Sequence, residues 1–241
     1  MKRILPLVFI FIGITSYSQI SLSRHNGTPI TDGQVIAFNT IAFPAAEMDF
    51  YVRNLSTTTS TNVKAICESL VNNDGTGFEF CFGNECLSYV EEGERYPSTP
   101  VVLAPNGVNG EFDHFLNTNA GNGLPQDYVF RFYQINGSGV EVGNSITMTY
   151  RYDATLSIDD INQLETSGVI VKSTLVSNEL SLDVLTPSQM DMFDITGKLV
   201  NNSKLQYGLQ TVNVSSLSPG VYVLKFTSAE GRVSTKKIMK G

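Results

Sequence analysis

Three cysteines and two histidines are the side chains of the sequence best suited to redox, metal-binding or acid–base chemistry near neutral pH. Cys81 and Cys86 enclose four residues with Gly-Asn at the centre, and both residue types tolerate the positive φ that a tight hairpin requires. This spacing favours a disulfide across two adjacent strands, and so short a loop predicts modest stabilisation. Cys67 shares a strand face with Val63 and Ala65, which favours a buried free thiol. A bond from Cys67 to Cys81 or Cys86 is the alternative.

These residues form no recognised catalytic or metal-binding motif. The sequence has no Cys-x-x-Cys, so a redox enzyme is not expected, and no His-x-His or His-Glu-x-x-His, so a zinc site has little support. A Ser/His/Asp triad can gather its members from distant positions, but there is no Gly-x-Ser-x-Gly elbow. His114, within residues 111–115, is expected to be a hydrogen-bonded loop residue. We therefore predict no catalytic, cofactor-binding or metal-ligating residue, and no cofactor.

Carboxylates are abundant, with 23 Asp and Glu against 16 Lys and Arg and a net charge of −7. Phosphate binding needs clustered Lys and Arg, so this balance argues against a nucleic-acid partner. Residues 91–94 are interpreted as a solvated acidic turn. Residues 72–76 offer oxygen ligands for Ca²⁺ but lack the twelve-residue EF-hand spacing, so a hairpin turn is preferred. Tyrosines on the expected strands could stack on sugars, but core packing explains them better.

The first 18 residues have the organisation of a secretory signal peptide. A positive pair at residues 2–3 precedes an apolar run at residues 4–14. Two small residues, Ser16 and Ser18, occupy the positions at which signal peptidase requires small side chains. Cleavage is therefore expected between Ser18 and Gln19. The run is shorter than the roughly 20 residues that cross a bilayer, so no transmembrane segment is expected in the mature chain. Passage through an oxidising compartment permits disulfides.

The elements that must position these side chains are strands. Met48, Phe50 and Val52 alternate with polar neighbours, the period-2 pattern of a half-buried strand. Asn-Gly and Asp-Gly pairs between the apolar segments mark hairpin turns. Roughly seven to nine short strands predict an antiparallel β-sandwich of immunoglobulin-like shape. Strands are expected at residues 34–43, 47–54, 62–70, 77–82, 100–103, 127–135 and 144–152.

Residues 153–167 break the strand pattern, because they are polar and acidic and contain no aromatic residue. We interpret them as an interdomain linker with a short helical turn at Ile158–Leu164. Charge also changes here: residues 19–160 carry a net −11 and residues 161–241 a net +2, which suggests two domains with different roles. The sequence thus predicts an all-β chain. Its expected parts are a signal peptide (1–18), an immunoglobulin-like β-sandwich passenger (19–155), a linker (156–167) and a small second β-sandwich (168–241).

Three short motifs follow one another within the expected second sandwich, residues 168–241. Residues 190–200 contain a strand, an Asp-Ile-Thr-Gly-Lys turn and a return strand; residues 212–224 contain a Ser-Ser-Leu-Ser-Pro-Gly-Val-Tyr run; and residues 236–240 read Lys-Lys-Ile-Met-Lys. Both turns suit ordinary hairpins. Together the segments resemble the type A form of the C-terminal sorting domain of type IX (Por) secretion cargo. The resemblance is carried by Asp194, Gly197, Lys198, Leu217, Pro219, Gly220, Tyr222, Lys236 and Lys237.

This resemblance implies a route of export and its partners. Such cargo crosses the inner membrane on its signal peptide, folds in the periplasm and crosses the outer membrane of a Gram-negative cell through the type IX translocon. A sortase-like peptidase removes the sorting domain, which here implies a cut within residues 153–170. The passenger is then released or attached to surface lipopolysaccharide. The sequence departs from the family at residues 172–179, which lack the proline-containing opening of the domain.

The expected protein is therefore secreted or displayed on the outer cell surface. With few histidines, no nucleophile motif and an acidic surface, the passenger is expected to be a non-catalytic binding, adhesion or structural module with an unknown extracellular ligand. The alternative is a small secreted hydrolase with a carboxylate-based active site on loops, since a carboxylate pair cannot be found by sequence position alone. Fold does not decide between them, because function resides in sites.

Overall fold

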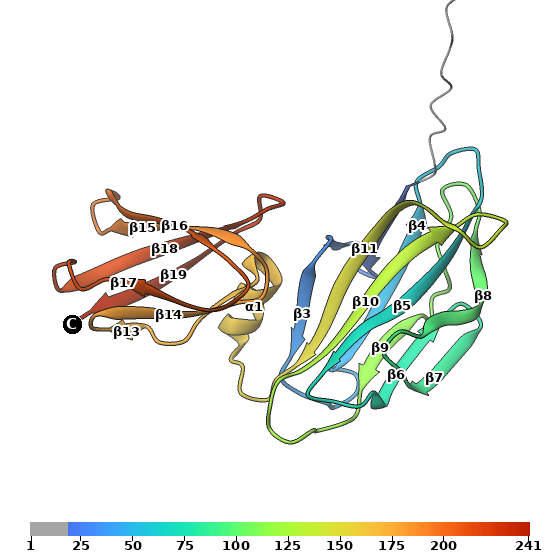
Figure 1. The fold of residues 1–241 in the computed structure, drawn as a ribbon, viewed down its shortest axis with the longest axis horizontal. Helices are drawn as coiled ribbons and strands as arrows, with labels where there is room; N and C mark the ends of the chain where they lie inside the picture. Colours follow the sequence, from blue (N-terminus) through green and yellow to red (C-terminus); the bar gives the residue numbers. More distant parts are fainter. Residues whose placement is uncertain (1–18) are drawn as a thin grey trace, which may run out of the picture.

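The computed structural model describes residues 19–241 and consists of two β-sandwiches joined by one helix (Figure 1). The expected signal peptide, including Ser18 at its cleavage site, lies outside the described residues. Gln19 is described, and its carbonyl oxygen accepts a hydrogen bond of 2.8 Å from the backbone nitrogen of Leu55. The prediction of an all-β chain with two sandwich domains is confirmed.

The passenger sandwich pairs two sheets, with strand orders β2-β1-β4-β9-β6-β7 and β3-β11-β10-β5-β8. Most neighbours are antiparallel, as predicted, but β3 runs parallel to β11 because the chain crosses to the second sheet after β2. The strands are β1 (Ile20–Arg24), β2 (Pro29–Ile30), β3 (Gln34–Phe38), β4 (Glu47–Asn54), β5 (Thr61–Val71), β6 (Thr76–Phe82), β7 (Glu85–Tyr89), β8 (Arg95–Leu103), β9 (His114–Asn117), β10 (Gln126–Ile135) and β11 (Glu141–Tyr152).

Aromatic side chains from facing strands fill the passenger core. The period-2 pattern directs them inward, so Phe80 stacks on Phe115 at a centroid distance of 4.7 Å and Phe50 meets Phe132 edge-on at 5.2 Å. Each of these four side chains is at most 1% exposed to solvent. Tyr150 lies in the same core, and its hydroxyl donates a 2.6 Å hydrogen bond to the Ala46 carbonyl oxygen. Aromatic pairs at these separations add to the burial energy.

The segment expected to be a linker forms helix α1 (Ile158–Ser167), longer than the short turn that was predicted. Ser157 caps its first turn, and the side chain of Asp160 returns a hydrogen bond to the Ser157 backbone, completing a capping box. Gly168 ends the helix with φ 69°. A Cβ at Gly168 would lie 2.6 Å from Cβ of Thr186, so both the conformation and the space require glycine.

The second sandwich has its own hydrophobic core, which includes Leu182, Met192, Leu224 and Phe226. Its sheets have the orders β12-β14-β17 and β13-β19-β18-β15-β16, and β13 runs parallel to β19. Its strands are β12 (Val169–Val171), β13 (Leu175–Val176), β14 (Glu179–Val184), β15 (Ser188–Asp194), β16 (Leu199–Leu205), β17 (Gly208–Asn213), β18 (Gly220–Ser228) and β19 (Val233–Lys240).

Helix α1 packs between the two sandwiches (Figure 1). A small apolar cluster forms there from Ala37 of the passenger, Leu164 of the helix and Ile170 of the second sandwich. Near the end of the helix, Oε1 of Glu165 lies 2.6 Å from Nη2 of Arg24 in β1. The helix therefore belongs to a junction that contacts both domains.

Candidate functional site

The predicted Asp194 turn connects β15 to β16. Oδ1 of Asp194 accepts hydrogen bonds from the Thr196 backbone nitrogen (2.8 Å), the Thr196 hydroxyl (2.6 Å) and the Lys198 backbone nitrogen (3.1 Å). These bonds, led by that from the Thr196 hydroxyl, lower the pKa of Asp194. Gly197 takes φ 83°, which completes the turn. The side chains of Asp194 and Thr196 therefore fix the shape of a turn that is otherwise exposed.

The second predicted motif forms the loop that leads into β18. The Tyr222 hydroxyl donates a 2.9 Å hydrogen bond to the Ser218 carbonyl oxygen, which ties the strand to the loop before it. Leu217 is half-buried against the domain core, whereas Pro219 and Gly220 are exposed. Tyr222 thus anchors a loop whose apex faces solvent.

Sheet register brings these two motifs together. Asp194 is opposite Tyr222 between β15 and β18, and Gly220 is opposite Lys240 between β18 and β19. Both motifs and the end of β19 therefore lie at the edge of the second sandwich that is remote from the passenger (Figure 1).

The two predicted lysines of β19 lie apart from this edge. Lys236 and Lys237 are opposite Leu224 and Val223, within the strand. Nζ of Lys236 lies 3.8 Å from Oδ1 of Asp160 in α1, whereas Lys237 is exposed. Lys236 thus faces the domain junction rather than the turn of Asp194.

The cysteines are arranged as the spacing favoured. Cys81 and Cys86 are opposite each other on β6 and β7 and form a disulfide, and Cys67 is free and fully buried. Burial, with a smaller contribution from the charge of Glu92, raises the pKa of the Cys67 thiol to about 12. A thiol with that pKa remains protonated at neutral pH and is a poor nucleophile.

His114 differs from the expected loop histidine, because it begins strand β9. Its Nε2 lies 2.7 Å from Oε1 of Glu79, and its Nδ1 lies 2.8 Å from the Phe112 carbonyl oxygen and 4.0 Å from Oε1 of Glu47. Burial alone would lower the pKa of His114, but the hydrogen bonds to Glu79 and Phe112 and the charge of Glu47 raise it. Part of this cluster of charged groups around His114 had a signal in the sequence: Glu47 and Asp49 are two residues apart, which places both carboxylates on one face of β4.

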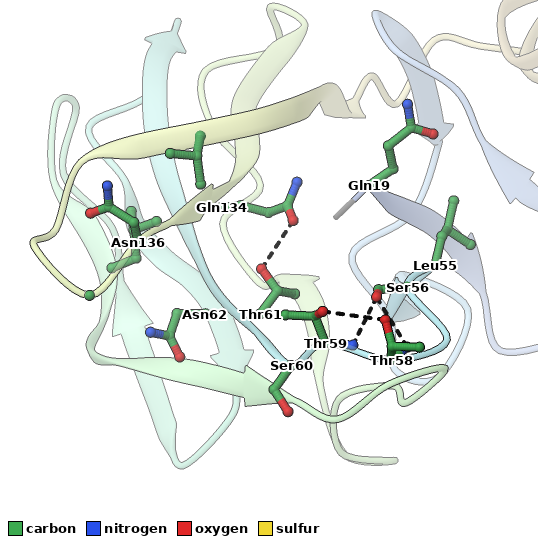
Figure 2. A pocket seen from close by; sticks show the side chains of 13 residues that line it. Gln19, Leu55, Ser56, Thr58, Thr59, Ser60, Thr61, Asn62, Gln134 and Asn136 are labelled. Carbon is green, nitrogen blue, oxygen red and sulfur yellow. Dashed lines mark hydrogen bonds between the residues drawn. The ribbon is translucent and has the colours of Figure 1, made fainter. Parts of the chain in front are cut away.

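A polar cavity of about 720 Å³ opens at one end of the passenger sandwich, between the loop after β4 and the β10–β11 hairpin (Figure 2). The Thr61 hydroxyl donates a 3.0 Å hydrogen bond to Oε1 of Gln134, whose side chain is buried. Oγ of Ser56 accepts a 2.9 Å hydrogen bond from the Thr59 backbone nitrogen, which holds the loop that forms one wall. The lining residues are all uncharged: Gln19, Leu55, Ser56, Thr58, Thr59, Ser60, Thr61, Asn62, Gln134, Ile135, Asn136, Gly137 and Val142.

Comparison with known families decides the nature of the second sandwich. Residues 174–240 match the family described as the secretion system C-terminal sorting domain. The C-terminal domain is a type IX secretion sorting domain. The match begins at Thr174, after β12, in the region where the sequence lacks the usual prolines. A sorting domain of this kind indicates secretion cargo that interacts with the type IX machinery and is exported toward the cell surface.

Solved structures show distant similarity. The N-terminal domain of PorA is 14% identical and covers 56% of this chain and 98% of its own, with a TM-score of 0.35. The CupB2 chaperone of Pseudomonas aeruginosa is 10% identical (86% and 97% covered, TM-score 0.37), and the E. coli chaperone DraB is 12% identical (92% and 96% covered, TM-score 0.38). No curated protein matches the chain. Within residues 19–241, no helix is long and apolar enough to cross a membrane.

Proposed function

We propose that the protein is exported by the type IX system to the cell surface or the medium, where its passenger acts as a non-catalytic binding module. The sorting domain supports the export route. The cavity at the end of the passenger supports the binding role, because its lining presents hydroxyl and amide groups without a charged side chain. Such a lining suits a neutral, hydroxyl-rich ligand of the carbohydrate class, with Leu55, Ile135 and Val142 offering apolar contact.

The export route includes two cleavages. Signal peptidase cuts between Ser18 and Gln19, and a sortase-like peptidase then removes the sorting domain. Residues 160–171 are held in α1 and β12, which protects them. Within the predicted region, Ala154 and Thr155 are exposed in the loop between β11 and α1, and this loop is the part that a peptidase reaches most easily. The passenger then remains free or becomes attached to surface lipopolysaccharide.

The sorting assignment is tested by ending the chain after Ser167. The passenger has its own core, so the truncated protein should fold, remain in the periplasm and be absent from the surface and the medium. Fractionation followed by immunoblotting measures this, with the full chain as the control. Export of the truncated protein at the normal level would contradict the assignment.

The binding role is tested by screening the exported passenger against neutral glycans. A glycan that binds should lose affinity about tenfold when Asn62 on the cavity wall is changed to Ala, because one or two hydrogen bonds disappear. Asn84→Ala, on the exposed β6–β7 hairpin, is the matched control and should leave affinity unchanged. Equal loss in both variants would mean that binding occurs elsewhere.

The rival function, a small hydrolase that uses carboxylates, finds no support at this cavity. A glycosidase needs two carboxyl groups on either side of the scissile bond, and the cavity lining contains neither Asp nor Glu. The lining therefore favours binding over hydrolysis at this place.

A further inference from the structure

One edge of strand β19 is open over most of its length. On one side β18 pairs with β19 from Val233 to Lys240, but on the other side β13 pairs only with Met239 and Lys240. No other strand within residues 19–241 pairs with this side, so residues 233–238 leave the sheet open there. Such an edge presents backbone donors and acceptors to which a further strand can add.

The backbone geometry shows which groups point out from this edge. The N–H of Met239 donates a 2.7 Å hydrogen bond to the Thr174 carbonyl oxygen, on the β13 side of the strand. The direction of hydrogen bonding alternates along a strand, so the N–H and C=O groups of Thr235 and Lys237 point to the same side. The polar groups that a new strand needs are therefore already directed outward.

A groove runs beside the open edge. A cavity of about 290 Å³ lies between residues 233–236 of β19 and the face of α1 that carries Asn162, Gln163 and Thr166. Successive side chains of a strand point to opposite faces of the sheet, and all four of these β19 residues line the cavity. The cavity therefore lies at the edge of the strand, and this edge is the open one because β18 occupies the other. Figure 1 places α1 beside this part of the sorting domain and β13 at its remote end.

One buried side chain of the groove lacks hydrogen-bond partners. Gln163 is 4% exposed, and neither its amide nitrogen nor its amide oxygen has a partner within residues 19–241. An unpaired buried amide costs free energy, and a rotation of this side chain toward the groove lets both groups find partners there. Because an amide both donates and accepts, its complement is the N–H and C=O of a peptide group.

We propose that the groove binds an extended peptide segment of the export machinery, which adds to β19 as a new strand. This inference rests on the proposed function, because β19 belongs to the sorting domain. In strand addition the main chain supplies most of the affinity, and side chains at alternate positions supply the specificity. The backbone of the segment bonds to Thr235 and Lys237, and one of its peptide groups bonds to the Gln163 amide.

The charges around the groove indicate which side chains the segment carries. Lys237 is exposed and forms no ion pair within residues 19–241, and Lys225 of β18 is opposite Thr235 on the same outer face. Opposite charges on neighbouring strands attract, so acidic side chains on the outer face complement this edge. Side chains that face α1 are hydroxyls or amides, to suit its polar lining. A second copy of β19 would bring its own lysines, which disfavours pairing between two copies.

The test uses the chain without its leader (residues 19–241), isotopically labelled and titrated with the synthetic peptide acetyl-Thr-Glu-Asn-Glu-Thr-amide. The amide signals of Thr235 and Lys237 should shift, and their hydrogen exchange should slow about tenfold or more at saturation. The Met239 amide, which already has a partner, should change little. Acetyl-Thr-Lys-Asn-Lys-Thr-amide should bind more weakly. Equal binding of the two peptides, or no shift at Thr235 and Lys237, would overturn the proposal.

A proline on the open edge tests the role of the backbone. Thr235→Pro removes one outward N–H and keeps the pairing with β18, since an edge strand tolerates proline at such a position, and affinity for the acidic peptide should fall about tenfold. The matched control is Thr211→Pro in β17, which has an open edge in the other sheet. The N–H of Val214 bonds inward to Asn178, so by alternation the N–H of Thr211 also points outward. Equal loss of affinity in the two variants would contradict strand addition at β19.

A change of Gln163 tests the role of the buried amide and provides a second variant if proline disturbs β19. Gln163→Met removes both polar atoms at similar side-chain length. Affinity for the acidic peptide should fall several-fold, while the unfolding temperature stays the same or rises because an unpaired buried amide is removed. A lower unfolding temperature with unchanged affinity would mean that the amide serves only the fold, and the proposal would fail.

Export separates this inference from the proposed function. In cells, Thr235→Pro should lower the amount of protein at the surface and in the medium and leave folded protein in the periplasm, whereas Thr211→Pro should be exported normally. If Thr235→Pro is exported normally while the chain ending after Ser167 is retained, strand addition is wrong and the export route stands. If the chain ending after Ser167 is exported as well, the proposed route itself is wrong and the inference fails with it.

Discussion

Arg24 and Glu165 link the two domains across 141 residues of sequence: Nη2 of Arg24 in β1 lies 2.6 Å from Oε1 of Glu165 in α1. The backbone of the same helical residue serves both sides, because the Glu165 carbonyl oxygen accepts from Gln34 of the passenger (3.2 Å) and from Arg232 of the sorting domain (3.1 Å). Glu165 is therefore the residue at which the helix, the passenger and the sorting domain meet.

The first prediction concerns this junction. Glu165→Gln should loosen the contact between passenger and helix and leave both cores folded, because the cores are separate. Both side chains of the ion pair are 27% exposed, so its loss should lower the free energy of unfolding by less than about 1 kcal/mol. Small-angle scattering should show a broader range of domain distances. Glu179→Gln, an exposed carboxylate of β14, is the control; identical scattering of the two variants would argue against a role for the pair in orienting the domains.

Period-2 alternation was sufficient to predict most strands. The strand expected at residues 47–54 has those bounds, and the strands through Phe80 and Phe130 were also expected. Strands β7 and β9 were missed because they are short, so they owe their extended form to pairing with neighbours rather than to their own pattern.

The candidate sites were predicted less completely than the strands. The motifs of the sorting domain were recognised by their resemblance to a family, and the first of them is also encoded locally, since the contacts of Asp194 stay within four residues. By contrast, Asp49 and His114 are opposite each other only because β9 inserts between β4 and β6, and no local pattern encodes that order. Helix α1 had a sequence signal, the pairing of Ser157 with Asp160, that the acidic composition of the segment obscured.

The second prediction concerns the acid sensitivity of the sorting turn. The pKa of Asp194 is lower in the folded protein than in the unfolded chain, so its hydrogen bonds stabilise the turn above the ordinary pKa of about 3.9 and are lost as the pH falls through the lowered value. The amide signals of Thr196 and Lys198 should therefore change together at acidic pH. In Asp194→Asn this step should disappear, whereas persistence of the same step would assign it to another group.

The third prediction compares a buried ion pair with an exposed one on the same strand pair. Asp127 and Arg151 are directly opposite on β10 and β11, joined by two hydrogen bonds of 2.6 Å, with side chains 12% and 8% exposed. Burial alone would lower the pKa of Arg151, but Asp127 raises it, so the guanidinium stays charged. Asp127→Asn leaves that buried charge unpaired and should lower the free energy of unfolding of the passenger by about 3 kcal/mol or more.

The control for this prediction is Glu141→Gln. Glu141 lies 2.9 Å from Arg131 but is 45% exposed, and Arg131 keeps a second partner in Glu68. Loss of the Glu141–Arg131 ion pair should lower the free energy of unfolding, measured by chemical denaturation, by less than about 1 kcal/mol. Equal costs for the two variants would mean that burial does not set the strength of these pairs.

The fourth prediction concerns the cysteines. Native protein should show no thiol that reacts with a disulfide reagent at pH 8, because Cys67 is fully buried and its pKa is raised to about 12. Unfolding without reductant should expose one thiol per chain, and unfolding after reduction should expose three. Cys81→Ala/Cys86→Ala should lower the free energy of unfolding by about 2 kcal/mol, since the closed loop is short. Cys67→Ala is the control for the count: it should leave no reactive thiol in the unreduced, unfolded chain, and a thiol that persists there would show that Cys81 and Cys86 are not joined.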